Sequence, residues 1–109
     1  MVKQLVWSDD NFGAVRVDNW PAGAPRLFTV VLQTNNFIGS ITIQGSIAVE
    51  PSDDDWFDLN TETYLAPERT ENKYKNKFFN CKGRIIWMRA VIQKSVERHP
   101  GRVERILVN

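Results

Sequence analysis

Apolar and polar side chains alternate along most of this chain, in short segments that end at turn-forming residues. In residues 26–34, Phe28, Val30 and Leu32 share one phase of the alternation. In residues 40–49 the isoleucines and the valine share one phase, while serine, threonine and glutamine fill the other. Successive side chains of a strand point to opposite faces of a sheet, so this period of two predicts half-buried β-strands. Helical periodicity is hard to find, which indicates an all-β chain.

About eight short strands are expected from this pattern, at near-regular spacing. The expected strands occupy residues 4–7, 14–18, 26–34, 40–49, 56–60, 74–79, 84–93 and 103–109. A helix fits only around residues 65–72, where Pro67 could stand in its first turn. Such spacing is typical of an antiparallel β-sandwich or a jelly-roll-like fold. We expect residues 1–109 to form a single β-sandwich domain, because this length suits one domain.

Composition excludes several classes of protein. The 14 basic and 13 acidic residues nearly balance, which argues against a nucleic-acid partner. The apolar runs are too short to cross a bilayer and the first residues lack a signal peptide, so no membrane partner is expected. Cys81 is the only cysteine, so an internal disulfide is excluded. A lone thiol fits assembly in a reducing cytoplasm.

Catalytic and cofactor motifs are missing from the sequence. His99 is the only histidine, and no second His or Cys lies at metal-ligand spacing, so no transition-metal site is expected. A nucleophilic pair of Cys81 and His99 is the formal alternative, but an idle thiol and a turn histidine are the interpretation that we favour. A nucleophile elbow, a phosphate loop and a zinc-binding helix motif are all absent. We therefore expect a protein that is not an enzyme and has no cofactor.

An acidic run, Asp53 to Asp55 with Asp58 nearby, is the best candidate for an ion site. Clustered carboxylates suit calcium, but the run lacks the spacing that lets alternate carboxylates converge. Aspartate also favours turns, because its side chain bonds to the nearby backbone. We interpret PSDDDW, residues 51–56, as a hairpin turn after which Trp56 re-enters the core, and calcium binding is the alternative.

Loop aromatics are the candidates for contact with other molecules. Phe12, Trp20 and Phe37 are expected in loops, where exposed aromatic side chains make good interface anchors. Trp20 is also a candidate platform on which a sugar ring could stack. Trp56 and Trp87 begin or occupy apolar strands, where core packing is the usual fate. Because Trp87 and Arg89 are two residues apart, they share a face, which permits a stacked pair.

Two segments of the chain carry a resemblance to a known group of proteins. They are ITIQGSIAVEPSDDDWFDLN and FFNCKGRIIWMRAVI, within a match that spans residues 26–93. The matching residues are Gln44, Gly45, Ser46, Trp56, Phe57, Leu59, Gly83, Trp87, Arg89 and Ala90. The pattern resembles small β-sandwich virion proteins of tailed bacteriophages, among them contractile-tailed phages of marine and cyanobacterial hosts. The turn is PSDDD here, where that group has a Gly or Asn turn.

The resemblance implies a non-enzymatic virion structural protein. Such proteins decorate or cement the capsid, or sit in the neck, tail or fibres, and they dock on other virion subunits. The resemblance also implies assembly in the host cytoplasm, location in the virion, and a homo-oligomer, for which we expect a trimer or another cyclic form. The alternative function is a carbohydrate-binding β-sandwich module that uses exposed Trp20 to adsorb to the host surface. Coplanar exposed aromatics would favour that alternative, whereas aromatics in the core or at a subunit contact would favour the virion role.

Overall fold

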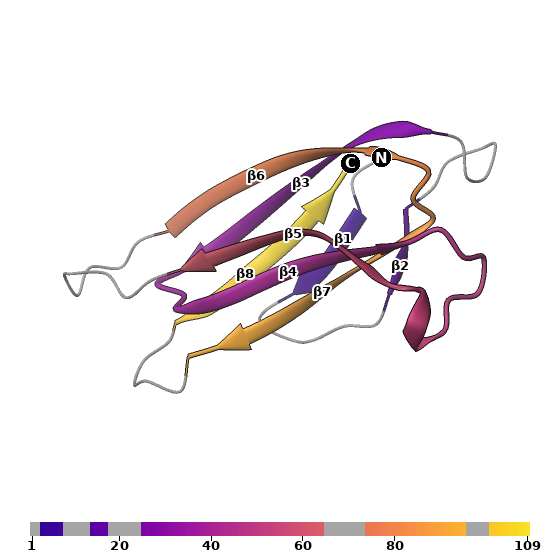
Figure 1. Cartoon of the computed structure of the whole chain (residues 1–109). Coiled ribbons are helices and arrows are strands. Elements are labelled where there is room, and N and C mark those ends of the chain that lie inside the picture. Colours follow the sequence, from indigo (N-terminus) through magenta and orange to yellow (C-terminus); the bar gives the residue numbers. More distant parts are fainter. Residues whose placement is uncertain (1–2, 8–13, 18–24, 65–73, 96–100) are drawn as a thin grey trace.

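The computed structural model of the chain describes residues 3–7, 14–17, 25–64, 74–95 and 101–109. These residues form eight strands and one 3₁₀ turn (Figure 1). The strands are β1 (Lys3–Trp7), β2 (Val15–Arg16), β3 (Arg26–Asn35), β4 (Gly39–Ser46), β5 (Phe57–Tyr64), β6 (Tyr74–Gly83), β7 (Trp87–Lys94) and β8 (Arg102–Val108), and the turn is η1 (Asp53–Asp55). The prediction of an all-β chain is confirmed. The helix expected around residues 65–72 lies outside the described residues.

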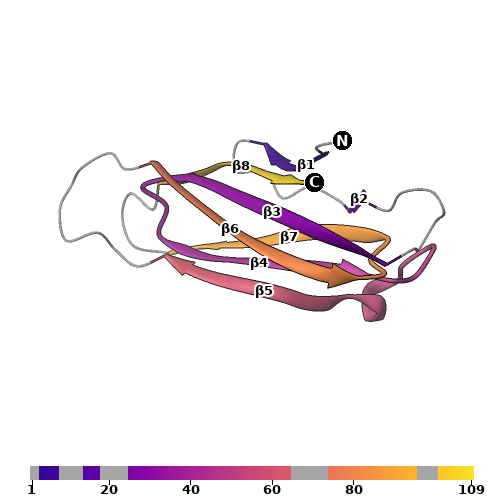
Figure 2. The same ribbon diagram turned by 90° about the horizontal axis from the view of Figure 1, so that it is seen from above.

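Two four-stranded antiparallel sheets face each other as a sandwich (Figure 2). The sheet with the order β1-β8-β3-β6 is called the β3 sheet, and the sheet with the order β2-β7-β4-β5 is called the β4 sheet. The pairing is nested: β1 pairs with β8, β2 with β7, β3 with β6 and β4 with β5. This nesting is the connectivity of a jelly roll, in which one long hairpin is wound into two sheets.

The core lies between the sheets and is built by the alternation seen in the sequence. Phe28, Val30 and Leu32 of β3 are fully buried, and so are Ile41 and Ile43 of β4. The residues between them face outward and are partly or largely exposed. The period-two prediction is therefore confirmed for β3 and β4, which are inner strands of their sheets.

Four strand boundaries differ from the prediction by three residues or more. Residues 61–64, expected in a connection, continue β5 to Tyr64, because they pair with residues 39–42 of β4. Residues 80–83, expected as a turn, continue β6 and pair with residues 26–29 of β3, because Cys81 keeps packing against the core. β7 begins only at Trp87, and Ile85 and Ile86 are buried in the connection before it. The expected strand 40–49 ends at Ser46, whose hydroxyl accepts a hydrogen bond from the Ala48 amide. This local bond turns the chain away from the sheet.

Phe37 lies in the turn between β3 and β4 and is only 4% exposed. Asn36 adopts a left-handed conformation with φ 53°, and this bend sends the next side chain inward. The Phe37 ring packs edge-to-face on Tyr64, with 5.4 Å between the ring centroids. The prediction of an exposed anchor at Phe37 is therefore wrong, because the turn folds the ring into the core. Phe12 and Trp20 lie outside the described residues.

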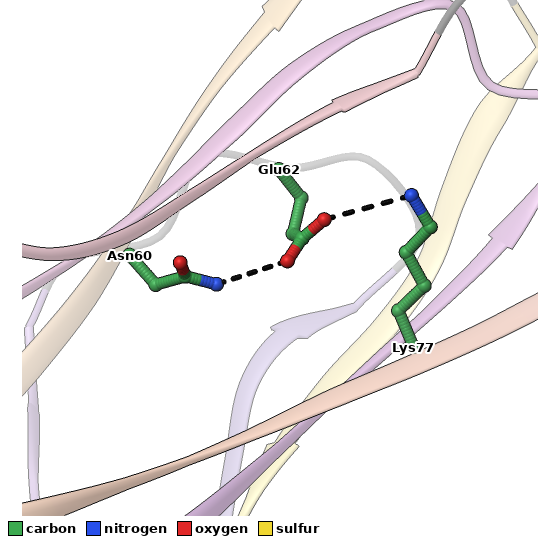
Figure 3. A network of polar contacts seen from close by, with 3 residues as sticks. All are labelled: Asn60, Glu62 and Lys77. Atoms are coloured by element: carbon green, nitrogen blue, oxygen red, sulfur yellow. Dashed lines mark hydrogen bonds and ion pairs between the residues drawn. The ribbon is translucent and has the colours of Figure 1, made fainter.

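A polar cluster joins the two sheets along the side where β5 and β6 are the edge strands (Figure 3). Lys77 of β6 forms an ion pair of 3.5 Å with Glu62 of β5, and the Asn60 amide donates a hydrogen bond to Glu62. The Lys77 ammonium also lies 4.5 Å from the centroid of the Tyr64 ring. Charged side chains at a sheet edge discourage pairing with a foreign strand. The cluster thus links the sheets and protects their edges.

Candidate interaction surface at the β4–β5 end

The connection between β4 and β5 lies at one end of the sandwich (Figure 1). It carries exposed apolar side chains. Ile47 and Val49 are each 65% exposed, and Phe57, the first residue of β5, is 41% exposed. We call residues 47–57 the β4–β5 end. Sequence reasoning missed Ile47 and Val49 as surface residues because they continue the inward phase of β4. Exposed apolar side chains so close together in the chain make this end a candidate interaction site.

The acidic run of the β4–β5 end is a capped 3₁₀ turn. The Asp55 carboxylate accepts hydrogen bonds from the Ser52 amide and the Ser52 hydroxyl, at 2.8 and 3.0 Å. The Asp55 amide donates in return to the Ser52 carbonyl at 3.0 Å. Because β4 and β5 pair on either side, the interpretation of residues 51–56 as a hairpin turn is confirmed. Among the described residues, His, Cys, Asp and Glu form no group that could hold a metal ion.

A hydrogen-bonded row crosses three strands on the outer face of the β4 sheet. Gln44 of β4 lies opposite Asp58 of β5 on one side and opposite Arg89 of β7 on the other. The Gln44 amide donates to the Asp58 carboxylate at 2.9 Å and accepts from the Arg89 guanidinium at 2.7 Å. Gln44 thus links Asp58 to Arg89 by hydrogen bonds and holds both side chains in place.

The row continues onto an aromatic ring. The Arg89 guanidinium carbon lies 4.3 Å from the centroid of the Trp56 ring, which is cation–π geometry. The prediction that Trp56 re-enters the core is wrong, because β5 begins one residue later and Leu59 packs against the core in its place. Trp56 lies partly exposed with Arg89 over one face. The stacked pair permitted between Trp87 and Arg89 is replaced by this pair across strands.

Trp87 fixes the other half of the β4–β5 end. Its indole N–H donates to the Val49 carbonyl at 3.0 Å, across 38 residues of sequence. Trp87 lies opposite Ser46 in the pairing of β4 with β7, so the bond is made directly beside the last residue of β4. The two tryptophans therefore hold the connection at both of its ends. A surface held in this way loses little conformational entropy when a partner binds.

Three further residues of the resemblance serve packing. Gly45 faces the core, where an added Cβ would lie 3.0 Å from Leu59 Cδ1 and 3.2 Å from Ile85 Cγ2. Ala90 and Ser46 are buried in β7 and β4. The motif thus combines small buried residues that allow close packing with residues that shape the β4–β5 end.

Two titratable groups in the described part of the chain have shifted pKa values. Burial raises the pKa of the Cys81 thiol above its ordinary value, which disfavours the reactive thiolate. Burial raises the pKa of Tyr64 to about 12, the nearby Glu62 carboxylate adds to the rise, and the Thr34 hydroxyl opposes it. The hydroxyls of Thr34 and Tyr64 are nevertheless buried without a hydrogen bond of good geometry. The second member of the Cys81–His99 pair lies outside the described residues.

Comparisons with known proteins add nothing to this geometry. No protein-family model, curated protein or solved structure matches the chain. A search of the described residues for a helix with the length and hydropathy of a membrane span found none.

Proposed function

We propose that this chain is a non-enzymatic structural protein of a bacteriophage virion. In this proposal it belongs to the capsid decoration, the neck or the tail, and it docks on other virion subunits through the β4–β5 end. One observation carries the proposal. Gln44 and Trp56 from one segment of the resemblance and Arg89 from the other meet on the surface, where the connection that carries the exposed Ile47 and Val49 leaves and rejoins the sheet.

The chemistry of the β4–β5 end suits a protein partner. Ile47, Val49 and Phe57 supply apolar area of the kind found at the centre of interfaces. Glu50 and Asp53 to Asp55 are exposed around them, in the position of a polar rim. A partner for this end therefore has an apolar centre with basic residues around it.

The carbohydrate-binding alternative depended on Trp20, which lies outside the described residues. A sugar stacks on an open aromatic face, but Arg89 covers one face of Trp56. Among the described residues the two most exposed aromatic side chains, Phe57 and Phe78, belong to different sheets and form no common platform. The described aromatic residues therefore favour docking on protein over binding of glycan.

Incorporation into particles tests the proposal. Virions of the phage that carries the gene are banded in a density gradient and probed with an antibody against the chain. We expect the chain to band with the particles. In a phage that lacks the gene, the variant Ile47→Ser with Val49→Ser, supplied from a plasmid, should stay in the unsedimented fraction.

The matched control is Val91→Thr, which changes an exposed apolar residue of β7 away from the β4–β5 end. It should band with the particles as the wild-type chain does. Absence of the wild-type chain from the banded particles would refute the virion assignment. Normal incorporation of the double variant would refute the assigned surface.

A further inference from the structure

The outward face of the β3 sheet carries a second group of exposed apolar side chains. Val31 of β3 lies opposite Phe78 of β6 on one side and opposite Leu107 of β8 on the other. Phe78 is 68% exposed, and Leu27 is 59% exposed further along β3. An apolar row therefore crosses three strands on the surface of the sandwich. We call Leu27, Val31, Phe78 and Leu107 the apolar row.

Two basic residues lie beside the apolar row. Lys82 lies opposite Leu27, and Arg105 lies opposite Gln33, to which it donates a hydrogen bond. Both side chains are exposed. Arg102 of β8 is a third basic residue of this sheet with an exposed side chain. Glu104 is the single acidic residue in the strands of this sheet, and it is paired with Arg102 at 2.8 Å.

The β4–β5 end has the opposite charge. Residues 47–57 contain Glu50, Asp53, Asp54 and Asp55, and they contain no lysine or arginine. Arg89, which lies over Trp56, is linked through Gln44 to the Asp58 carboxylate. The described residues thus include two apolar surfaces, one with acidic and one with basic residues beside it. Contact between two copies of the same surface would bring like charges together, which is unfavourable. Contact between the two different surfaces brings opposite charges together around apolar centres.

We propose that the β4–β5 end of one copy docks on the apolar row of a second copy. This inference rests on the docking role proposed above for the β4–β5 end, and it names the partner. The contact is heterologous, because each copy offers a different surface to each neighbour. Heterologous contacts close into a ring or continue as an open filament. Either product is a form of self-assembly that suits a symmetric particle.

Light scattering coupled to size-exclusion chromatography of the purified chain tests the contact. We expect the wild-type chain to elute as an oligomer whose mass falls as salt is added, since salt screens the charged rims. Phe78→Thr and the double variant Ile47→Ser with Val49→Ser should each elute at the mass of the monomer, 12.6 kDa. Val91→Thr, the matched control, should remain oligomeric. Circular dichroism and a melting curve establish that each variant is folded.

A mixing experiment separates this contact from other modes of assembly. The Phe78→Thr chain retains an intact β4–β5 end, and the double variant retains an intact apolar row. Their mixture should therefore form a dimer that contains one copy of each variant and grows no further. A mixture that stays monomeric would overturn the proposal. The proposal would also be overturned if Phe78→Thr became monomeric while the double variant stayed oligomeric. The copies would then assemble through contact between two β3 sheets.

The two proposals fail in different ways. A wild-type chain that is monomeric at low salt overturns the contact between copies, whether or not the chain bands with virions. A chain that forms oligomers but is missing from banded virions overturns the virion role and leaves the contact standing.

Discussion

At the scale of single residues, Gly45 allows Leu59 and Ile85 to pack closely against β4. Its inward position leaves no room for a larger side chain, because Leu59 and Ile85 stand against it. We expect Gly45→Val to lower the free energy of unfolding by about 1–3 kcal/mol, the usual cost of overpacking a core. Urea denaturation followed by tryptophan fluorescence measures the loss.

Gly83 is the matched control for Gly45. An added Cβ at Gly83 would have Ile85 Cγ1 as its nearest neighbour, at the ordinary contact distance of 3.9 Å. Gly83→Ala should therefore change the free energy of unfolding by less than about 0.5 kcal/mol. Equal losses at the two glycines would contradict the close packing inferred at Gly45.

The Tyr64 hydroxyl makes stability depend on pH in the alkaline range. Burial raises its pKa from 10.0 to about 12, so the folded state keeps the phenol neutral over a range where the unfolded state ionises. Its contribution to stability is fully present below pH 10 and is lost as the pH rises to about 12. The stability of the wild-type chain should therefore fall through this range.

Tyr64→Phe removes the titrating group and keeps the ring against Phe37. We expect this variant to be at least as stable as the wild type at neutral pH, since the buried hydroxyl has no hydrogen bond of good geometry. Its advantage should grow between pH 10 and 12, as measured by urea denaturation at a series of pH values. Parallel pH profiles for the two proteins would show that other groups, such as lysines, cause the alkaline loss.

At the scale of structural elements, the 3₁₀ turn η1 depends on one carboxylate of the acidic run. Asp55 accepts both hydrogen bonds from Ser52, whereas neighbouring Asp54 is exposed. We expect Asp55→Ala to lower the free energy of unfolding by about 1 kcal/mol, as loss of a capping side chain does. Asp54→Ala should leave it unchanged within about 0.5 kcal/mol.

The same element decides between a turn and an ion site. With the Asp55 carboxylate directed at Ser52, neither calcium nor a chelator should move the melting temperature. A ligand that binds only the folded state would raise it. A rise of several degrees with calcium, abolished in the Asp54→Ala variant, would show that the acidic run binds the ion.

Strands were predictable from the sequence where one face of the strand is buried and the other is exposed to solvent. Phe28 to Leu32 and Ile41 to Ile43 alternate because β3 and β4 each pair with two neighbours and cover the core. The prediction failed where alternation continues past the end of the sheet. Ile47 and Val49 keep the inward phase of β4, but a hydrogen bond to the Ser46 side chain turns the chain first.

For the hydrogen-bonded row on the β4 sheet, the sequence indicated the individual residues but not their contacts. Gln44, Trp56 and Arg89 stood out through the resemblance, and the polar phase of residues 40–46 placed Gln44 outward. Their meeting depends on the register of β4 with β5 and β7, and alternation carries no information about register between strands. Phe37 was misjudged for a similar reason, because the left-handed bend at Asn36 leaves no mark in hydropathy.

At the scale of the whole molecule, the nested pairing brings the first and last strands together. Lys3 of β1 lies opposite Val108 of β8, while the β4–β5 end forms the tip of the wound hairpin. Every strand pair except β4 with β5 joins segments that are distant in sequence. The sandwich therefore depends on which strands pair more than on the point at which the chain is opened.

A circular permutant tests this view of the molecule. A short glycine-serine linker joins Asn109 to Met1, and new ends are opened between Glu50 and Pro51, within the exposed connection. We expect this permutant to keep a β-rich circular dichroism spectrum and a single cooperative melting transition within several degrees of the wild type. All strand pairs remain available to it, and chain ends at exposed loops are well tolerated.

The control permutant is opened between Val31 and Leu32, in the middle of β3. That strand pairs with both β6 and β8 and supplies three fully buried side chains, so cutting it divides the centre of the β3 sheet. This permutant should show no cooperative transition. If the permutant opened after Glu50 also failed to fold, the two sheets would need an intact β4–β5 connection to come together. Folding would then depend on winding the hairpin from its tip.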